Sequence, residues 1–340
     1  MSEDERVAKL PRESGLLFGH ADAEQTLLAA YKSGRLPHAW LIAGEPGIGK
    51  ATLAYRFARF VLAHPDPRAD AVQQAASLAL DPGHPVARRV AAQAEGDLRT
   101  LERVINEDTG KLYTVIRVDE VRRLLAFFGS TAGAGTWRIA IVDSVDDLNA
   151  SSANSLLKLL EEPPERALLL LVSNAPGREL PTIRSRCRRL LLRPLAEADV
   201  AQALAAATGR EPSDAELKEA AAASGGSVAR GLALLEGDGL ALRKRVLDLI
   251  AQLPDPDPRA LHALGDALGG SDPQPLADFM DLVNGWLSTR LAVGTLPQNA
   301  RLAEVWERVN RSARDVDTYN LERKPLVFSV FGALAQAARG

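Results

Sequence analysis

The stretch at residues 44–52, Gly-Glu-Pro-Gly-Ile-Gly-Lys-Ala-Thr, constrains this chain more than any other part of its sequence. It matches the phosphate-binding loop pattern, a glycine, four residues and then Gly-Lys, through Gly49 and Lys50. In such loops main-chain N–H groups and the lysine hold phosphate groups. The next position normally carries Ser or Thr, whose hydroxyl binds Mg²⁺, but here it is Ala51. The pattern predicts a phosphate site without that hydroxyl, formed by Gly44, Gly47, Gly49, Lys50, Ala51 and Thr52.

The residues on both sides of this loop have the pattern that the motif requires. Residues 39–43 are an apolar run, which predicts a buried strand. After the loop, apolar side chains recur with the spacing of one helix face, at Ala54, Phe57, Ala58 and Val61. A buried strand, a glycine-rich loop and a helix in this order are the structural context of a phosphate-binding loop.

Four further segments predict strands of the same sheet, the first of them at an edge: residues 98–104, 139–143, 167–172 and 190–192. Segments with helical periodicity lie between them. Strands that alternate with helices predict an α/β fold with a parallel sheet and helices on both faces. We therefore expect one α/β nucleotide-binding domain over residues 1–194, with the Pro-, Ala- and Asp-rich stretch 65–96 as a surface insertion.

After Pro194 the strand pattern ends and only helical segments follow. Residues 195–250 are interrupted by Gly209 and by Gly225-Gly226, which predicts a small all-α domain of short helices. Residues 254–258, Pro-Asp-Pro-Asp-Pro, predict a boundary loop. Residues 259–340 then predict a second all-α domain.

Composition excludes several classes of protein. A net charge of −3 provides no overall positive field that would attract nucleic acid. A single cysteine, Cys187, excludes a disulfide framework and a cysteine-rich zinc site, and it fits a reducing compartment. The histidines show no metal-ligand spacing, so we expect no metal. No apolar stretch is long enough to span a membrane and the first residues lack an apolar signal core, so we predict a cytoplasmic protein with no membrane contact.

The predicted strand at residues 139–143 ends in Asp143, as does the metal-binding strand of nucleotide-hydrolysing phosphate-loop proteins. Hydrolysis needs a second acidic residue that activates water, and this chain has Ser144 there. We interpret Asp146 and Asp147 as an acidic cluster at a helix N-terminus, where the helix dipole favours negative charge. Because Ala51 and Ser144 lack two separate groups of one mechanism, the sequence predicts no ATP hydrolysis by this chain alone.

Three other polar features each have two interpretations. Asn174, just after the predicted strand 167–172, is either an amide close to a γ-phosphate or a turn residue. Arg230 either reaches a nucleotide or faces solvent. Five arginines crowd one short region: Arg184, Arg186, Arg188, Arg189 and Arg193. They form a solvated basic strip, or one of them stabilises the charge on a phosphate transferred in a neighbouring subunit.

Four stretches together resemble the clamp-loader branch of the AAA+ ATPases. They are Arg-Leu-Pro-His-Ala-Trp-Leu-Ile at residues 35–42, the phosphate loop at 44–52, Ser-Leu-Leu-Lys-Leu-Leu-Glu-Glu-Pro-Pro at 155–164 and Ser-Arg-Cys at 185–187. The leucine-rich run and Ser-Arg-Cys are specific to clamp loaders, whereas the phosphate loop alone is not. The resemblance is dense from residue 19 to residue 194 and thinner beyond it.

This resemblance implies an AAA+ core, a helical lid over residues 195–250 and a helical collar over residues 259–340. Members assemble through their collars into a five-subunit ring with motor subunits, and the ring places a sliding clamp on primed DNA. A non-hydrolysing member lends the arginine of its Ser-Arg-Cys, here Arg186, to the ATP site of an adjacent motor subunit as an arginine finger in trans. Asn174 and Arg230 match the sensor positions of the family.

The resemblance also bears on cofactors and on rival functions. Many members bind zinc through cysteines after the phosphate-loop helix, and because residues 64–96 contain none we predict no zinc. ATP or ADP bound without turnover is compatible with the loop. The rival interpretation is a motor subunit that hydrolyses ATP, which should have Thr at position 51 and Glu at position 144. A third interpretation, a DNA-binding module built on the sheet, conflicts with the weak net charge.

Overall fold

The computed structural model describes residues 10–106, 110–129, 136–177, 179–270, 274–319 and 321–339. The chain divides into two compact units, Met1–Leu232 and Ala233–Gly340. Each unit has its own apolar core, and each is described by itself below.

Within the described residues, five parallel strands form the sheet of the first unit, in the order β2-β3-β4-β1-β5. Their bounds are β1 Ala39–Ala43, β2 Leu98–Glu102, β3 Arg138–Asp143, β4 Ala167–Ser173 and β5 Arg188–Leu191. The inner strand β1 pairs with β4 and β5, so that Trp40 lies opposite both Leu170 and Arg188. The predicted parallel sheet is confirmed, and β2 lies at an edge as its pattern predicts.

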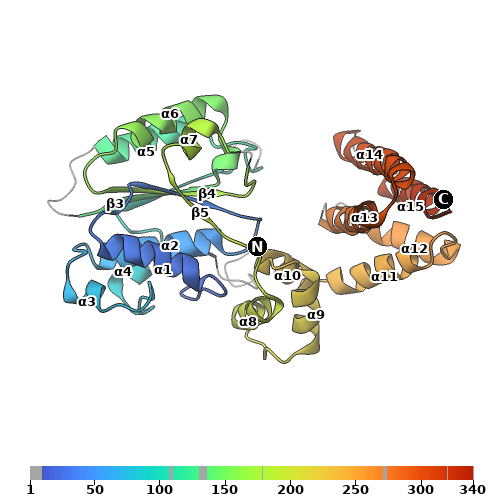
Figure 1. Ribbon diagram of the computed structural model, residues 1–340, viewed down its shortest axis with the longest axis horizontal. Coiled ribbons are helices and arrows are strands. Elements are labelled where there is room, and N and C mark those ends of the chain that lie inside the picture. The colour runs from blue at the N-terminus through green and yellow to red at the C-terminus, as the bar shows by residue number, and fades with distance from the viewer. Residues whose placement is uncertain are drawn as a thin grey trace. The chain divides into compact units, whose positions relative to one another are not determined.

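Helices cover both faces of this sheet (Figure 1). One layer consists of α1 Ala21–Lys32, α2 Lys50–Ala63, α3 Asp70–Gln73 and α4 Pro85–Ala91, and the other of α5 Val118–Gly129, α6 Ala150–Glu161 and α7 Pro181–Arg184. The side chains of β1 alternate between two apolar clusters: Trp40 and Ile42 belong to one, Ala39 and Leu41 to the other. Burial on both faces is why this strand is a continuous apolar run in the sequence.

The stretch 65–96, expected as a surface insertion, contributes to the core. It contains α3 and α4, and Val72, Leu78 and Val90 are buried in the cluster that holds Trp40. These apolar residues are few and widely separated among polar ones, so the sequence pattern underestimates their packing.

Three short helices follow: α8 Glu197–Thr208, α9 Ala215–Ala223 and α10 Val228–Leu235, and the boundary between the two units falls within α10. The predicted interruptions are confirmed, because Gly209 ends α8 with a left-handed φ of 71° and Gly225 and Gly226 have φ values of 62° and 83° before α10. Left-handed backbone is readily adopted only by glycine, which explains why the helices stop there.

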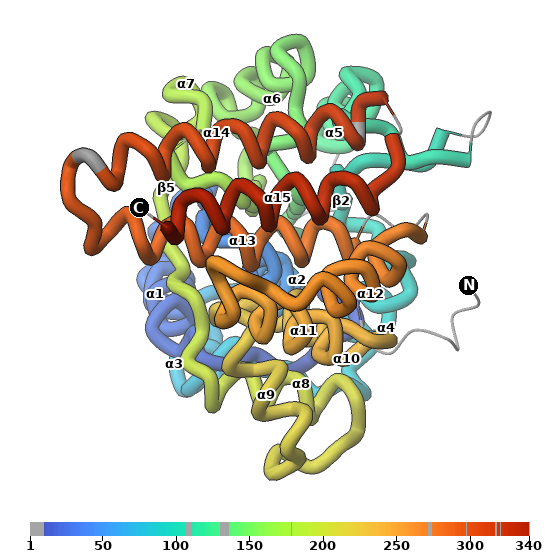
Figure 2. Tube along the Cα trace, turned by 90° about the vertical axis from the view of Figure 1, so that its right-hand side faces the viewer, coloured from blue at the N-terminus to red at the C-terminus, as the bar shows by residue number. Residues whose placement is uncertain are grey.

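The second unit is all-helical, with α11 Gly239–Ala251, α12 Pro258–Leu268, α13 Gln274–Val293, α14 Leu296–Tyr319 and α15 Arg323–Arg339. α14 and α15 run side by side along much of their length (Figure 2). Phe279 and Phe331 are buried in its core, which also includes Val246 and Leu249 of α11. The predicted boundary loop 254–258 therefore lies inside this unit. Among the helices described, none is long and apolar enough to cross a membrane.

Candidate functional site: a nucleotide pocket and a surface arginine

The phosphate loop lies between β1 and α2, at the carboxyl end of β1. Gly47 and Gly49 have φ values of 75° and 101°, which a side chain would strain. A Cβ at Gly44 would come within 2.7 Å of the carbonyl oxygen of Leu192. The three glycines thus serve the tight path of the loop, and the N-terminus of α2 faces the space that a phosphate would take.

Lys50 is the charged group of this loop and is only 3% exposed. Its Nζ donates a hydrogen bond to the carbonyl oxygen of Glu45. Burial lowers the pKa of Lys50 to about 8, although the nearby Asp143 and Asp146 oppose that shift. The lysine is therefore mostly protonated at neutral pH and loses its proton at mildly alkaline pH.

A cavity of about 400 Å³ opens beside the loop. The phosphate-loop and polar residues that line it are Gly47, Gly49, Lys50, Ala51, Thr52, Asp143 and Asn174. Apolar lining comes from the N-terminal segment and from α8 and α10, including Leu16, Leu17, Phe18, Ala203, Ala207, Val228 and Leu232. Polar groups for phosphates together with apolar side chains for a flat base fit a nucleotide.

The N-terminal wall of this cavity is held by two arginines of α2 that sequence reasoning missed. Arg59 is 5% exposed and donates to the carbonyl oxygens of Arg12 and Ser14, while Arg56 donates to that of Gly15. Arg56 also pairs with Glu24 at 2.6 Å. Burial lowers the pKa of Arg59 to about 10. No local sequence motif predicts these hydrogen bonds, because they join segments more than forty residues apart.

Of the two positions that lack hydrolytic groups, one lines the pocket and the other, Ser144, follows Asp143, which lines it. Ala51 lines the cavity and offers only a methyl group. Ser144 is 2% exposed, and its Oγ lies 3.5 Å from Oδ2 of Asp147. Burial raises the pKa of the neighbouring Asp143, and Glu102 raises it further. The residues present fit the phosphates and base of a nucleotide but do not supply the usual magnesium-binding hydroxyl.

Asp146 and Asp147 lie in the first turn of the short 3-10 helix η2 Val145–Asp147, in agreement with their interpretation as an acidic cluster at a helix N-terminus. The N-cap of the following helix α6 is Asn149, which accepts a bond of 2.9 Å from the Ser152 N–H. Asp146 also accepts bonds from Ser173 Oγ (3.1 Å) and from the main-chain N–H of Asn174 (2.5 Å). It thereby fixes the end of β4 beside the pocket.

The two predicted sensor residues differ in position. Asn174 lines the cavity, as its location after β4 suggests. Arg230 is exposed on α10, whereas Val228 and Ala229 of the same helix line the cavity. The start of this helical segment touches the phosphate loop directly: Ser227 Oγ donates to the carbonyl of Pro46 at 3.0 Å, and the Ala229 N–H donates to that of Gly47 at 3.3 Å.

Arg186 lies away from this pocket. It comes just before β5, which runs parallel to β1 with Arg188 opposite Trp40, whereas the phosphate loop follows Ala43 at the other end of β1. Four residues of strand separate the two ends by about 13 Å. Arg186 lies at the amino ends of the strands, and the loop lies at their carboxyl ends. The Arg186 guanidinium is therefore poorly placed to act in the pocket of its own chain.

The sequence stretches outside the phosphate loop that carry the clamp-loader resemblance meet at these amino ends. His38, just before β1, shares a hydrogen bond of 3.0 Å between its Nε2 and the carbonyl of Leu160 at the end of α6. Cys187 packs against the apolar cluster that includes side chains of α5 and α6, and burial raises the pKa of its thiol to about 12. Cys187 therefore anchors the segment while the arginine before it stays partly exposed.

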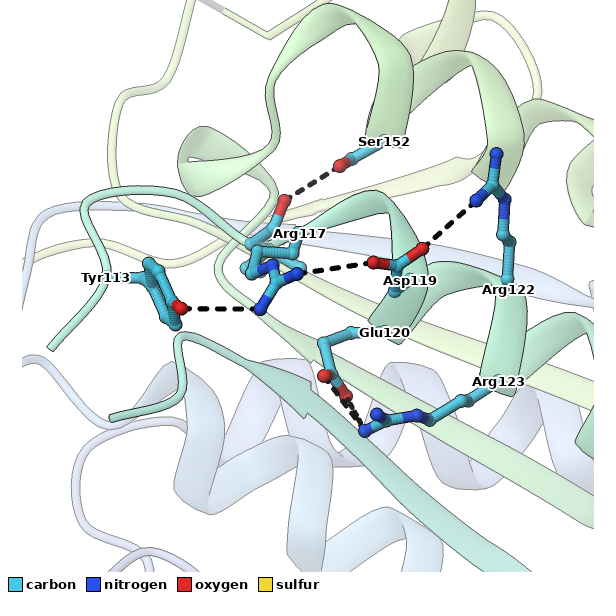
Figure 3. A network of polar contacts seen from close by, with 8 residues as sticks. Tyr113, Arg117, Asp119, Glu120, Arg122, Arg123 and Ser152 are labelled. Atoms are coloured by element: carbon cyan, nitrogen blue, oxygen red, sulfur yellow. Dashed lines mark hydrogen bonds and ion pairs between the residues drawn. The ribbon is translucent and has the colours of Figure 1, made fainter. Parts of the chain in front are cut away.

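Two other kinds of site have little support in the part of the chain that is described. No group of three or more His, Cys, Asp or Glu side chains there could hold a metal ion. The arginines around the start of α5 are ion-paired: Arg117 and Arg122 with Asp119, and Arg123 with Glu120 (Figure 3). This cluster therefore does not form an uncompensated basic surface for nucleic acid.

Comparison with known proteins gives consistent matches. A family model described as DNA polymerase III, delta subunit matches residues 19–196. DNA polymerase III subunit delta' of Pseudomonas aeruginosa is 37% identical over 190 residues, 56% of this chain and 53% of that protein. The subunit delta' of Escherichia coli is 30% identical over 229 residues, 67% of this chain and 63% of that protein. The chain thus spans less than two thirds of the length of either relative.

More distant matches carry other subunit names. DNA polymerase III subunit tau/gamma of Haemophilus influenzae is 28% identical over 255 residues, 72% of this chain and 34% of that protein. A solved structure of a DNA polymerase III gamma subunit-related protein from Thermotoga maritima aligns with 94% of this chain and all of that one, at 16% identity and a TM-score of 0.45.

Proposed function

The chain belongs to the family described as DNA polymerase III, delta subunit, and from that premise we propose that it is a delta'-type subunit of a bacterial clamp loader. In this role it is a non-hydrolysing AAA+ stator that lends Arg186 to the ATP site of a neighbouring gamma/tau-type motor subunit. A delta subunit would complete the ring, which would load a sliding clamp onto primed DNA during replication in the cytoplasm.

The observation that carries this proposal is the separation of two features in the fold. The pocket beside the phosphate loop has Ala51 where a hydrolase has a magnesium ligand, and Asp143 of its lining is followed by Ser144 where a hydrolase has a water-activating acid. The guanidinium of Arg186 is partly exposed at the opposite edge of the sheet, about 13 Å of strand away. A chain with a deficient site of its own and an outward-facing arginine fits catalysis in trans.

The motor-subunit alternative is less well supported. A motor needs both missing groups in its own pocket, and gamma/tau relatives match this chain at lower identity than the delta' relatives do. The pocket still fits a nucleotide, so we propose that ATP or ADP binds there without turnover. In that state Lys50 holds the phosphates and the apolar lining of the cavity holds the base.

We further propose that the second unit is the collar. Val293 and Leu296, at the turn between α13 and α14, are 83% and 87% exposed, and Trp306 is 45% exposed. Val293 and Leu296 are close in sequence at this turn, and contiguous patches of exposed apolar side chains mark interfaces with other proteins. Because α11 shares the core of α12–α15, a chain that ends at Glu236 removes this unit as a whole. We expect that shorter chain to keep its melting transition but not to co-purify with the motor subunits; co-purification at wild-type yield would contradict the collar role.

The experiment that tests the finger is the ATPase rate of the complex reconstituted with motor subunits. Arg186→Ala should lower the rate that depends on this chain by about a thousandfold or more at the affected site, the usual effect of losing an arginine finger. The exposed Arg184→Ala is the matched control and should leave the rate unchanged. The isolated wild-type chain should release no phosphate above background. An unchanged rate with Arg186→Ala would refute the finger, and turnover by the isolated chain that disappears with Lys50→Ala would support a motor.

A further inference from the structure

Arg186 is not free in the isolated chain. Its Nη2 lies 2.7 Å from Oε1 of Glu161 at the end of α6. Its Nη1 donates to the carbonyl oxygen of Thr182 at 2.9 Å and lies 3.3 Å from the hydroxyl oxygen of Ser185. Both terminal nitrogens of the guanidinium are therefore engaged by groups of the same chain.

We propose that Glu161 is a positioning residue that latches Arg186 in the unassembled chain and releases it when a neighbour's nucleotide arrives. This inference rests on the proposed finger role of Arg186 and adds a step to it. The neighbour's phosphate and the Glu161 carboxylate are both anions, so they compete for the same N–H groups.

The local structure holds the carboxylate in place. α6 ends at Glu161 because Pro163 and Pro164 cannot continue the helix. The bond between His38 and the Leu160 carbonyl fixes the main chain one residue before Glu161. The Glu-Glu-Pro-Pro end of the leucine-rich run thus positions the Glu161 carboxylate next to the Ser-Arg-Cys segment.

The exposure of the pair makes the latch weak and reversible. The side chains of Arg186 and Glu161 are 34% and 49% exposed, so water screens their attraction. A phosphate bound by two N–H groups replaces one carboxylate oxygen at 2.7 Å, and this exchange favours the assembled state. An exposed ion pair of this kind shifts an equilibrium by about 1.5- to 5-fold.

The test uses the full chain and motor subunits loaded with a non-hydrolysable ATP analogue. Glu161→Gln keeps the shape of the side chain and removes its charge, and Glu162→Gln makes the same change at the next residue, which is also exposed. We expect Glu161→Gln to lower the Kd for the loaded motor subunit by about 1.5- to 5-fold. Glu162→Gln should not change it, and Glu161→Asp should lie closer to wild type.

A double-mutant cycle separates this inference from the proposed function. In the Arg186→Ala background the effect of Glu161→Gln should vanish, because the two residues act as one unit. When the complex hydrolyses ATP, Glu161→Gln should lower its KM for ATP by the same factor and leave kcat unchanged. The latch is overturned if Glu161→Gln raises the Kd or leaves it unchanged, or if it lowers kcat. It is also overturned if the effect of Glu161→Gln persists in the Arg186→Ala background. Only an unchanged rate with Arg186→Ala alone overturns the finger itself.

Discussion

Nucleotide binding by this chain should weaken as the pH rises above about 8, because Lys50 loses its proton there. Phosphate binds the charged lysine, and a bound phosphate raises the pKa of Lys50 again, so the measured affinity follows the protonated fraction of the free chain. With a pKa of about 8 that fraction falls about eightfold between about pH 7.5 and pH 9, which corresponds to about 1.2 kcal/mol. The assay is equilibrium binding of a fluorescent ATP analogue at these two pH values.

The matched control is Lys50→Arg, whose guanidinium keeps its charge throughout this range. Its affinity, whatever its absolute value, should not fall between about pH 7.5 and pH 9. Loss of affinity of the same size in Lys50→Arg, or a flat profile in the wild type, would refute the assignment of this transition to Lys50.

The lowered pKa of Lys50 also makes the free energy of unfolding depend on pH, and the direction of that dependence follows from the pKa. The ordinary pKa of the lysine is 10.5, so between about 8 and 10.5 the unfolded chain binds the proton and the folded chain does not. The free energy of unfolding therefore contains an unfavourable contribution from Lys50 below about pH 8, and this contribution is relieved as the pH rises through that window.

Two further substitutions test the pocket. Ala51→Thr should introduce magnesium dependence: addition of EDTA should weaken nucleotide binding by about tenfold in the variant, the effect of one hydroxyl contact to a cation, and not in the wild type. Equal EDTA sensitivity of both proteins would contradict the role given to the missing hydroxyl. Gly47→Ala would put a Cβ 2.4 Å from Ser227 Oγ at a φ of 75°, and we expect a loss of about 1–3 kcal/mol in urea unfolding. Gly34→Ala, with a φ of 67° and open space around it, is the control for strain alone, and an equal loss there would show that crowding by Ser227 contributes nothing.

The strands and the phosphate half of the pocket were predictable because their signals are local. A strand buried on both faces must be a continuous apolar run, and a loop that wraps a phosphate must have glycines at its left-handed positions. Residues 39–52 contain both patterns without interruption. The tertiary contacts of Asp146 and Asp147 were not predictable, because their partners, Ser173 and Arg103, belong to neighbouring strands and loops that adjoin only after the sheet has formed.

The apolar residues that line the pocket had no local sequence pattern that predicted them. Leu16, Leu17, Ala207 and Leu232 are unremarkable apolar residues in segments nearly two hundred residues apart. Arg56 and Arg59 resemble ordinary helix arginines until their hydrogen bonds to residues 12–15 are seen. Packing, and not any motif, selects these residues.

Local chemistry alone thus specifies a phosphate loop, a parallel sheet and the absence of the hydroxyl and the acid needed for hydrolysis, since each depends on contiguous residues. Because the loop follows β1 and Arg186 precedes β5, a parallel sheet already places them at opposite ends of the strands, and only the tertiary structure brings the end of α6 and Glu161 to the guanidinium. Such relations depend on which strands become neighbours, and contacts between distant segments determine that order.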